Sequence, residues 1–288
     1  EQLVFVKKSI RGKGMKGAVG TAASYKELLS ESDISSLYME KMVMDELGIK
    51  AYDAATQIYS RKQDLRIVEA LSSIACTLHK FSLDFRILQS PPIGEFSEPF
   101  GKMQVGSSAM PFKRNPINSE KIDSLSRIVE NAYQSAWNNA ASTVLERSLD
   151  DSANRRIFIP GSFIALDEIL LTEIKVVKGM SIHSTATSRL MSSYGVFAST
   201  ERVLMELGKK GADRQKMHEV IREESLKAWV YVQEGKENPL KNALMENNEI
   251  LSYLSKDEIE KLLDASEYTG DAAERTNLVI DRARKRNN

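Results

Sequence analysis

Residues 52–89 read YDAATQIYSRKQDLRIVEALSSIACTLHKFSLDFRILQ, and neither glycine nor proline interrupts them. Apolar residues recur in this stretch at intervals of three and four, which places them on one face of an α-helix. That face contains Leu71, Ile74, Ala75, Leu78, Phe81, Phe85 and Leu88. The pattern predicts one helix from about Tyr52 to Gln89, much longer than the roughly 10–14 residues of an average helix. Such a helix needs partners to cover its apolar face.

Two more long helices are predicted downstream. The first follows Asn118 and has its own apolar face, formed by Ile122, Leu125, Ile128, Val129 and Ala132. The second starts near Ser162 and weakens at Gly179. Together with the helix over 52–89 they predict a bundle of long helices.

The helices predicted in the last third of the chain are shorter. Helices are predicted over 188–207, 213–233 and 256–265, and Ser-x-x-Glu sequences at 24–27 and 255–258 are typical of helix starts. Alternating patterns typical of strands are nearly absent. We therefore expect an all-α fold, with a long helical bundle over 1–182 and a smaller helical domain over 183–288.

The composition argues against several classes of function. Forty basic and forty acidic side chains give zero net charge, which offers no global attraction for nucleic acid. The single cysteine, Cys76, cannot form an intrachain disulfide, and one cysteine with three histidines does not provide the ligand set of a structural zinc site, which uses two or more cysteines. No apolar run approaches the roughly 18 residues of a membrane span, and the first residues do not resemble a signal peptide. We expect a cytoplasmic protein with no metal and no cofactor.

A long connection, residues 91–116, separates the first two long helices. Connections of this length are usually functional or disordered. Its second half, GSSAMPFKRNP at 106–116, places small, hydroxyl, cationic and amide side chains just before a helix. Free amides and the positive end of the helix dipole favour an anion at such a point. The composition thus predicts a carboxylate or oxyanion site, and a mobile polar surface loop is an equally good interpretation of it.

The same eleven residues resemble the signature loop of the fumarase/aspartase superfamily, and with Asn118-Ser119-Glu120 they are similar to its adenylosuccinate lyase branch. Three further segments resemble that branch in the same order: GMKGAVGTAAS at 14–24, TQIYSRK at 56–62 and LERSLDDSANRR at 145–156. The resemblance covers the chain from about residue 9 to about 210 and is weaker beyond.

What the resemblance implies is specific. The reaction would be β-elimination of fumarate from adenylosuccinate to give AMP, and from the succinylated aminoimidazole carboxamide ribotide of purine biosynthesis. The protein would be a homotetramer in which bundles from four subunits form a common core and each active site takes residues from three chains. No cofactor is implied.

The resemblance also implies roles within the loop. Ser107 would be the base that removes a proton from the carbon beside a carboxylate, which requires the loop to lower the pKa of its hydroxyl strongly. Lys113 and Asn115 would hold the carboxylates of the fumaryl group, with Ser108 and Met110 as further substrate contacts.

Two residues outside the loop receive roles in the same way. Glu120, one turn into the following helix, would orient a catalytic histidine or the loop itself. Without the resemblance it is an ordinary first-turn acid that complements the helix dipole. Gln57, placed at the start of the longest predicted helix, would bind substrate, although an exposed glutamine alone carries no such information.

Arg147, Ser152 and Arg156 form the last candidate group. Guanidinium and hydroxyl groups are preferred donors to a phosphate monoester, and the resemblance makes these residues contacts to the nucleotide phosphate and ribose. The alternative is a surface lattice of ion pairs with neighbouring aspartates and glutamates, the usual fate of mixed charge.

The general acid of the branch is a histidine upstream of the Lys16-Gly17 region, and another site histidine lies in its N-terminal domain. Neither has a counterpart in this chain, and its own histidines do not replace them. We therefore expect an N-terminally truncated chain with little turnover by itself.

Three other functions remain open at this point. A sibling lyase acting on argininosuccinate, another succinyl amine or a smaller dicarboxylic acid would not need the phosphate donors at 147, 152 and 156. A non-catalytic helical scaffold would keep the oligomeric core without the chemistry. A nucleic-acid adaptor has only the basic C-terminus in its favour.

Overall fold

The computed structural model describes residues 2–101, 110 and 112–287, so Ser107 and Ser108 lie outside the described residues. The chain divides into two compact units. Glu1–Pro92 with Phe96–Ile182 forms the first, called here the bundle unit, and Ile93–Glu95 with His183–Asn288 forms the second, the C-terminal unit. Helices dominate both, and the all-α prediction is confirmed.

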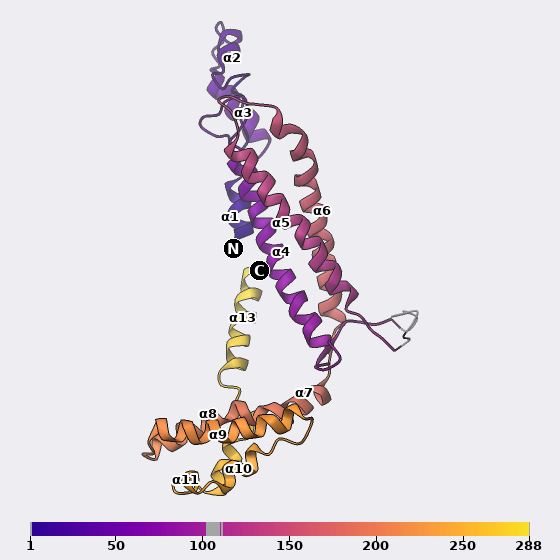
Figure 1. Ribbon diagram of the computed structural model, residues 1–288. Helices are drawn as coiled ribbons and strands as arrows, with labels where there is room; N and C mark the ends of the chain where they lie inside the picture. Colours follow the sequence, from indigo (N-terminus) through magenta and orange to yellow (C-terminus); the bar gives the residue numbers. More distant parts are fainter. Residues whose placement is uncertain (1, 102–109, 111, 288) are drawn as a thin grey trace. The chain divides into compact units, whose positions relative to one another are not determined.

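Three long helices form the centre of the bundle unit, with α5 antiparallel to the other two (Figure 1): α4 (Lys62–Gln89), α5 (Ile117–Ala141) and α6 (Asp150–Gly179). Each packs against the other two. Their buried apolar side chains form the core, and on α4 and α5 several of these come from the predicted faces. Buried polar side chains such as Asp64, Asp123 and Glu173 lie among them. The main core cluster contains Leu71, Ala75, Ile122, Val129, Ala165, Leu166 and Ile169, and a second one contains Leu65, Val68, Ala132 and Ala136.

The predicted start of α4 was wrong. The helix begins at Lys62, and at Tyr52, where the helix was predicted to begin, the backbone pairs with another segment instead. The amide of Tyr52 donates to the carbonyl of Gly12 at 2.9 Å, and Gly12 and Ala51 form an isolated β-bridge. The 28 residues of α4 also make it shorter than α6, which has 30. Gln57 consequently lies on the connection that precedes α4, not on the longest helix.

The predicted start of α6 was also wrong, since the helix begins at Asp150 and not near Ser162. Pro160 lies inside it, where a proline removes one backbone hydrogen bond. Packing of Phe158 against the second core cluster and two acidic residues in the first turn favour continuing the helix in spite of that loss.

Short elements complete the bundle unit. They are α1 (Gln2–Ser9), α2 (Ala23–Leu28), α3 (Ser36–Glu46), and the strands β1 (Phe96–Ser97) and β2 (Ser181–Ile182), which pair antiparallel. The side chain of Ser35 caps α3, whereas Ser24 caps nothing, because α2 has already begun at Ala23. The Ser-x-x-Glu prediction at 24–27 was therefore wrong.

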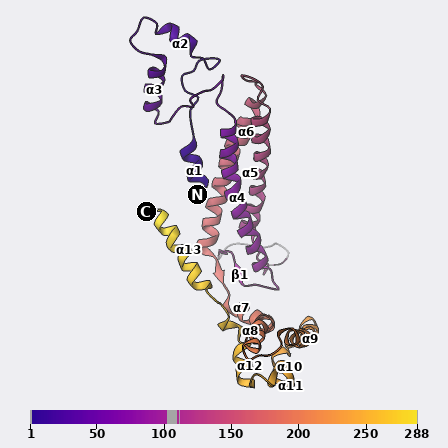
Figure 2. The ribbon, with the colours of Figure 1, turned by 90° about the vertical axis from the view of Figure 1, so that its left-hand side faces the viewer.

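The C-terminal unit is built from shorter helices (Figure 2). They are α7 (Ser184–Leu190), the π-helical turn η1 (Met191–Gly195), α8 (Val196–Lys209), α9 (Arg214–Gln233), α10 (Leu240–Glu246), α11 (Asn248–Leu251), α12 (Lys256–Leu262), the 3-10 turn η2 (Ala265–Glu267) and α13 (Ala272–Asn287). Its core includes Val203, Leu207, Met217, Leu240, Ile250 and Ile259. Asp213 caps α9 and Ser255 forms a capping box with Glu258, which confirms these two predicted helix starts.

None of the described helices combines the length and apolar character needed to cross a bilayer. Across the same residues, no group of three or more His, Cys, Asp or Glu side chains is arranged to hold a metal ion.

Candidate functional site

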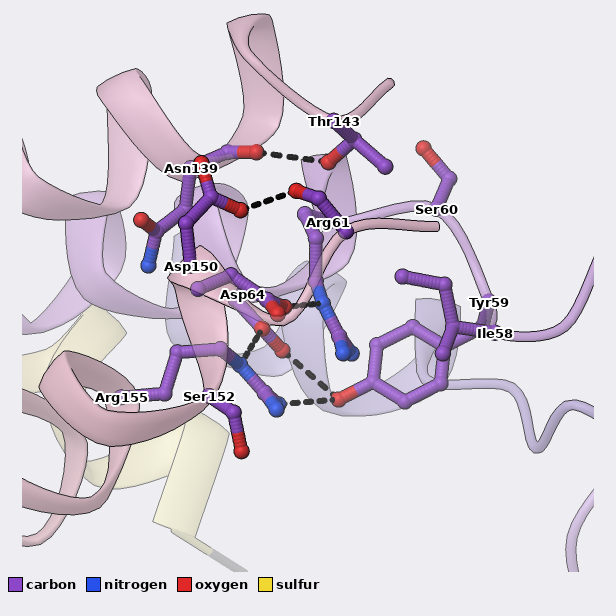
Figure 3. Close-up of polar contacts among 12 residues, drawn as sticks. Ile58, Tyr59, Ser60, Arg61, Asp64, Asn139, Thr143, Asp150, Ser152 and Arg155 are labelled. Carbon is purple, nitrogen blue, oxygen red and sulfur yellow. Dashed lines mark hydrogen bonds and ion pairs between the residues drawn. The ribbon is translucent and has the colours of Figure 1, made fainter. Parts of the chain in front are cut away.

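The starts of α4 and α6 are joined by a buried network of charged and hydroxyl groups (Figure 3). Arg61 forms an ion pair with Asp151, and both side chains are almost completely buried. Asp64 accepts hydrogen bonds from the Tyr59 hydroxyl at 2.8 Å and from Nε of Arg155 at 2.6 Å. Nη2 of Arg155 also donates to the Tyr59 hydroxyl at 2.8 Å. The network fixes the first turn of α6 against the connection that precedes α4.

Tyr59 and Arg155 keep their protons at neutral pH. Burial raises the pKa of Tyr59, and the charge of Asp64 and its hydrogen bond raise it further, so the hydroxyl keeps its proton. Burial acts to lower the pKa of Arg155, but the hydrogen bond and charge of Asp64 outweigh it, and the net shift is upward. Tyr59, Asp64 and Arg155 are thus hydrogen-bonded to one another.

The predicted phosphate donors, Arg147, Ser152 and Arg156, lie at or just before the start of α6, and some of their hydrogen-bond donors have no protein acceptor in the described structure. Arg147 is half-buried, and its Nε is buried without a hydrogen-bond partner in the described structure. Ser152 lies in the first turn of α6, where helix amides favour an anion. Arg156 is exposed, and its Nη2 lies 3.5 Å from Oγ of Ser152. Two guanidinium groups and a hydroxyl near one helix start suit a phosphate monoester.

The alternative of a surface ion-pair lattice does not hold for these arginines. Within the described part of the chain, neither Arg147 nor Arg156 forms an ion pair, and the nearby acid Asp151 is occupied by Arg61. Since an unpaired buried donor is costly, the environment of Arg147 is better suited to a bound anion than to a ligand-free lattice.

Gln57 lies close in sequence to a contact that joins the two connections. The hydroxyl of Thr56 donates to the carbonyl of Glu146 at 2.7 Å, so Gln57 and Arg147 each directly follow a residue of this contact. Gln57 itself is exposed. The structure therefore brings Gln57 into the neighbourhood of Arg147, although they are far apart in the sequence.

The motif at 14–24 also lies against this end of the bundle. Gly20 has a φ of 87°, and a Cβ added to it would lie 1.9 Å from the carbonyl oxygen of Ala55. Only glycine permits this approach, because any side chain would collide with backbone. The glycine thus packs the motif against the connection that carries Gln57.

The second group of predicted site residues lies at the start of α5. Lys113, Asn115 and Glu120 line a cavity of about 590 Å³ together with Arg86 and Gln89 of α4. Lys113 and Glu120 are exposed, and Asn115 is partly buried. The amide of Lys113 donates to the carbonyl of Met110 at 2.9 Å, and Met110 is 42% exposed.

The prediction of free amides at the start of α5 was wrong. The buried carboxylate of Glu98 accepts hydrogen bonds from the amides of Asn118 at 3.1 Å and Ser119 at 2.6 Å. It also accepts from the Asn118 side chain and the Ser119 hydroxyl, each at 2.7 Å. The anion bound at the start of α5 is therefore the carboxylate of Glu98, which leaves Lys113 and Asn115 as the predicted anion contacts beside the cavity.

A second acid is buried near Glu98. Glu173 of α6 is 7% exposed and accepts a hydrogen bond from the Ser82 hydroxyl at 3.4 Å. Burial raises the pKa of Glu173, the hydrogen bond from Ser82 opposes this, and the charge of Glu98 adds to it. The folded state therefore binds the Glu173 proton more tightly than the unfolded chain does.

We expect Glu173→Gln to raise the free energy of unfolding at pH 7. The raised pKa means that the stability associated with this group is complete below the unfolded pKa and is lost as pH rises through the folded one. Urea denaturation at pH 4 and pH 7 measures the free energy of unfolding, and the gain in the variant should be smaller at pH 4.

Glu168→Gln is the matched control on the same helix. The hydrogen bond and ion pair with Lys121 lower the pKa of Glu168, so this substitution should lower the free energy of unfolding at pH 7. A variant of Glu173 less stable than the parent at pH 7 would contradict the prediction.

The two groups of site residues lie at opposite ends of the bundle unit. α5 runs from the Glu120 end to the connection that carries Arg147, and its 25 residues span about 37 Å. No small substrate bridges that distance. One copy of the chain therefore does not bring Lys113 and Glu120 together with Arg147, Ser152 and Arg156.

Sequence reasoning missed the residues that build the site without facing the substrate. Tyr59, Arg61 and Arg155 lie inside the segments that carried the resemblance, which could have drawn attention to them. Their roles could not be predicted, because Arg155 pairs with Asp64 of α4 and Arg61 with Asp151 of α6. Glu98 gave no signal, because its role depends on the start of α5 lying beside β1.

The comparisons with known proteins agree with this architecture. A family model described as "Lyase" matches residues 6–130, and one described as "Adenylosuccinate lyase C-terminus" matches residues 196–279. Proteins named adenylosuccinate lyase from Schizosaccharomyces pombe and Pyrococcus horikoshii are 35% and 36% identical to the chain over 273 and 283 residues. These matches cover 94% and 98% of this chain but 56% and 59% of the relatives, so the chain spans little more than half of their length.

Solved structures show the same fold at lower identity. A fumarate lyase from Mesorhizobium matches 96% of this chain, over 59% of its own, with a TM-score of 0.78 and 20% identity. A β-carboxy-cis,cis-muconate cycloisomerase from Acinetobacter calcoaceticus matches 98% of this chain, over 59% of its own, with a TM-score of 0.78 and 18% identity.

Proposed function

The chain belongs to the fumarase/aspartase superfamily of lyases, and on that basis we propose that it is the C-terminal portion of an adenylosuccinate lyase. Its reaction would be the β-elimination of fumarate from adenylosuccinate to give AMP, and from the succinylated aminoimidazole carboxamide ribotide. The observation that carries the proposal is the group of phosphate donors at the start of α6, where Nε of Arg147 is buried without a partner in the described structure. A nucleotide phosphate is the ligand that such a group suits best.

The residues at the other end of the bundle supply the chemistry for the succinyl part. Ser107 takes the proton from the carbon beside the carboxylate, the electron pair of that C–H bond becomes the double bond of fumarate, and the C–N bond breaks. Lys113 and Asn115 offset the charge that builds up on the carboxylate in the transition state, which is where electrostatic stabilisation is most effective. Ser108 and Met110 contact the substrate from the same loop, and Glu120 orients its partners.

The leaving nitrogen must take up a proton from another group. His79 lies on α4 within the bundle, with its Nε2 3.8 Å from Oδ1 of Asp123, and the proposal does not use it. In the proposal the proton comes from a histidine of the segment that the relatives have and this chain does not match.

The distance between the two ends supports a site built from more than one copy of the chain. We propose a homotetramer in which each site combines the Lys113 end of one copy with the Arg147 end of another. The exposed surface of α6 supports this, since a helix that is apolar on all sides is normally buried on all sides. Its exposed apolar residues include Ile157, Phe163, Ile164, Leu171, Ile174 and Val177, each at least 48% exposed in the single chain.

The alternative functions differ in which of the candidate site residues they would use. A lyase for argininosuccinate or another substrate without phosphate has no use for Arg147, Ser152 and Arg156. A non-catalytic scaffold has no use for these residues or for Lys113 and Asn115 over an open cavity.

The test joins the chain to the N-terminal segment of a curated relative and follows fumarate release. We expect release from adenylosuccinate and none from argininosuccinate, with AMP as a competitive inhibitor. Ser107→Ala should lower kcat by about 10²–10⁴, the range for a general base. Turnover of argininosuccinate would establish the sibling lyase, and absence of any turnover or AMP binding would establish the scaffold.

A further inference from the structure

A single side chain at the end of α4 holds both stems of the connection that carries Lys113 and Asn115. Oε1 of Gln89 accepts a hydrogen bond from the amide of Glu98 at 2.8 Å, on the stem that leaves β1. Nε2 of the same residue donates to the carbonyl of Arg114 at 3.1 Å, on the stem that enters α5. A glutamine amide has one accepting and one donating end, and Gln89 uses each end on a different stem.

Two further contacts join the same stems. Glu98 reaches from the first stem to the start of α5, where it accepts four hydrogen bonds from Asn118 and Ser119. The guanidinium of Arg114 lies 4.8 Å from the centroid of the Phe100 ring, which is within the range of a cation–π contact. The stems are thus tied to each other and, through Gln89, to α4.

We propose that Gln89 and Glu98 are positioning residues of the lyase site: they hold the two stems in register, so that Lys113 and Asn115 stay over the cavity beside Glu120. Glu98 is buried with both carboxylate oxygens occupied, so it acts through the residues it binds and not on a substrate. Gln89 lines the same cavity as Lys113 and Asn115, so replacing Gln89 should displace these two residues relative to the cavity. The inference rests on the proposed function.

The first test is Gln89→Met, which keeps the length of the side chain and removes both hydrogen bonds. In the enzyme completed with the relative's N-terminal segment, we expect kcat to fall at least about tenfold, because a displacement of about 1 Å can cost about 100-fold. KM should change less than kcat, and the thermal midpoint should stay within a few degrees. A purely structural role would lower the folded fraction and leave kcat per folded enzyme unchanged.

Gln134→Met is the matched control. Gln134 is an exposed glutamine of α5 whose hydrogen bond, 3.2 Å to Asn138, stays within its own helix. Its kcat should equal that of the parent. If both variants lost activity, the loss would be a general effect of replacing a bundle glutamine by methionine, and the proposal would be overturned.

Hydrogen exchange supplies a readout that does not depend on activity. In the chain itself, Gln89→Met should speed exchange of the Glu98 amide, and Glu98→Gln should speed exchange of the Asn118 and Ser119 amides, each by about tenfold or more. If the unsubstituted enzyme releases fumarate and Gln89→Met retains kcat within twofold, the positioning role is wrong and the lyase function stands. If the unsubstituted enzyme releases none while exchange responds as expected, the lyase function fails although the link between the stems is real.

Discussion

Mixing two inactive variants, Lys113→Ala and Arg147→Ala, should restore about a quarter of the unsubstituted activity when the subunits are allowed to exchange. Each variant alone should retain at most about one per cent, because one lacks a cation for the carboxylates and the other a donor for the phosphate. In a mixed oligomer some sites draw both ends from chains that carry the native residue. With equal amounts of the two chains, half of each end is native, which sets the expected fraction.

The reason for this expectation is geometric. The 25 residues of α5 hold the two ends about 37 Å apart, so a site that uses both ends, as proposed, draws them from different chains. The measurement is fumarate release after co-refolding the two variants, each completed with the relative's N-terminal segment.

The control is a pair of variants at the same end. Arg147→Ala mixed with Arg156→Ala should recover nothing, since both residues belong to one connection and helix start and enter any site together. Recovery by this pair, or failure of the first pair to recover in a confirmed mixed oligomer, would contradict a site shared in this way.

Removal of Arg61 should destabilise the bundle unit strongly. Arg61→Met leaves Asp151 buried without its partner, and breaking a buried ion pair from one side typically costs about 3–5 kcal/mol. Asp151 is already short of partners, because its Oδ1 is buried without a hydrogen bond in the described structure. Urea denaturation of the chain measures the loss as a change in the free energy of unfolding.

Two variants separate this effect from simple loss of a charge. Arg61→Met combined with Asp151→Leu should recover most of the stability, since a buried ion pair can be replaced by apolar residues at little cost. Lys80→Ala removes one partner of the exposed pair with Asp84 on α4 and should cost no more than about 0.5 kcal/mol. If Arg61→Met cost no more than Lys80→Ala, the network would not hold the start of α6.

The apolar faces of α4 and α5 made the bundle predictable, because a stripe of Leu, Ile and Ala at helical spacing has to be buried and the sequence offers almost only helices to bury it against. The ends of those helices were harder to place. The start of α4 depends on a bridge between Gly12 and Ala51, and continuation of α6 through Pro160 depends on packing of Phe158. Contacts between distant segments leave no periodic signal near the residues concerned.

The candidate site divides in the same way. Ser107, Lys113, Arg147 and Arg156 were predicted as site residues because their local segments resemble those of a known family, and no fold was needed to find them. Only the tertiary structure decided that Glu98 takes the amides at the start of α5 and that Arg61, not Arg147, takes Asp151. It also decided that Lys113 and Arg147 lie at opposite ends of one bundle. A sequence specifies which groups are present, whereas long-range packing determines which of them are already paired and which remain free for a ligand.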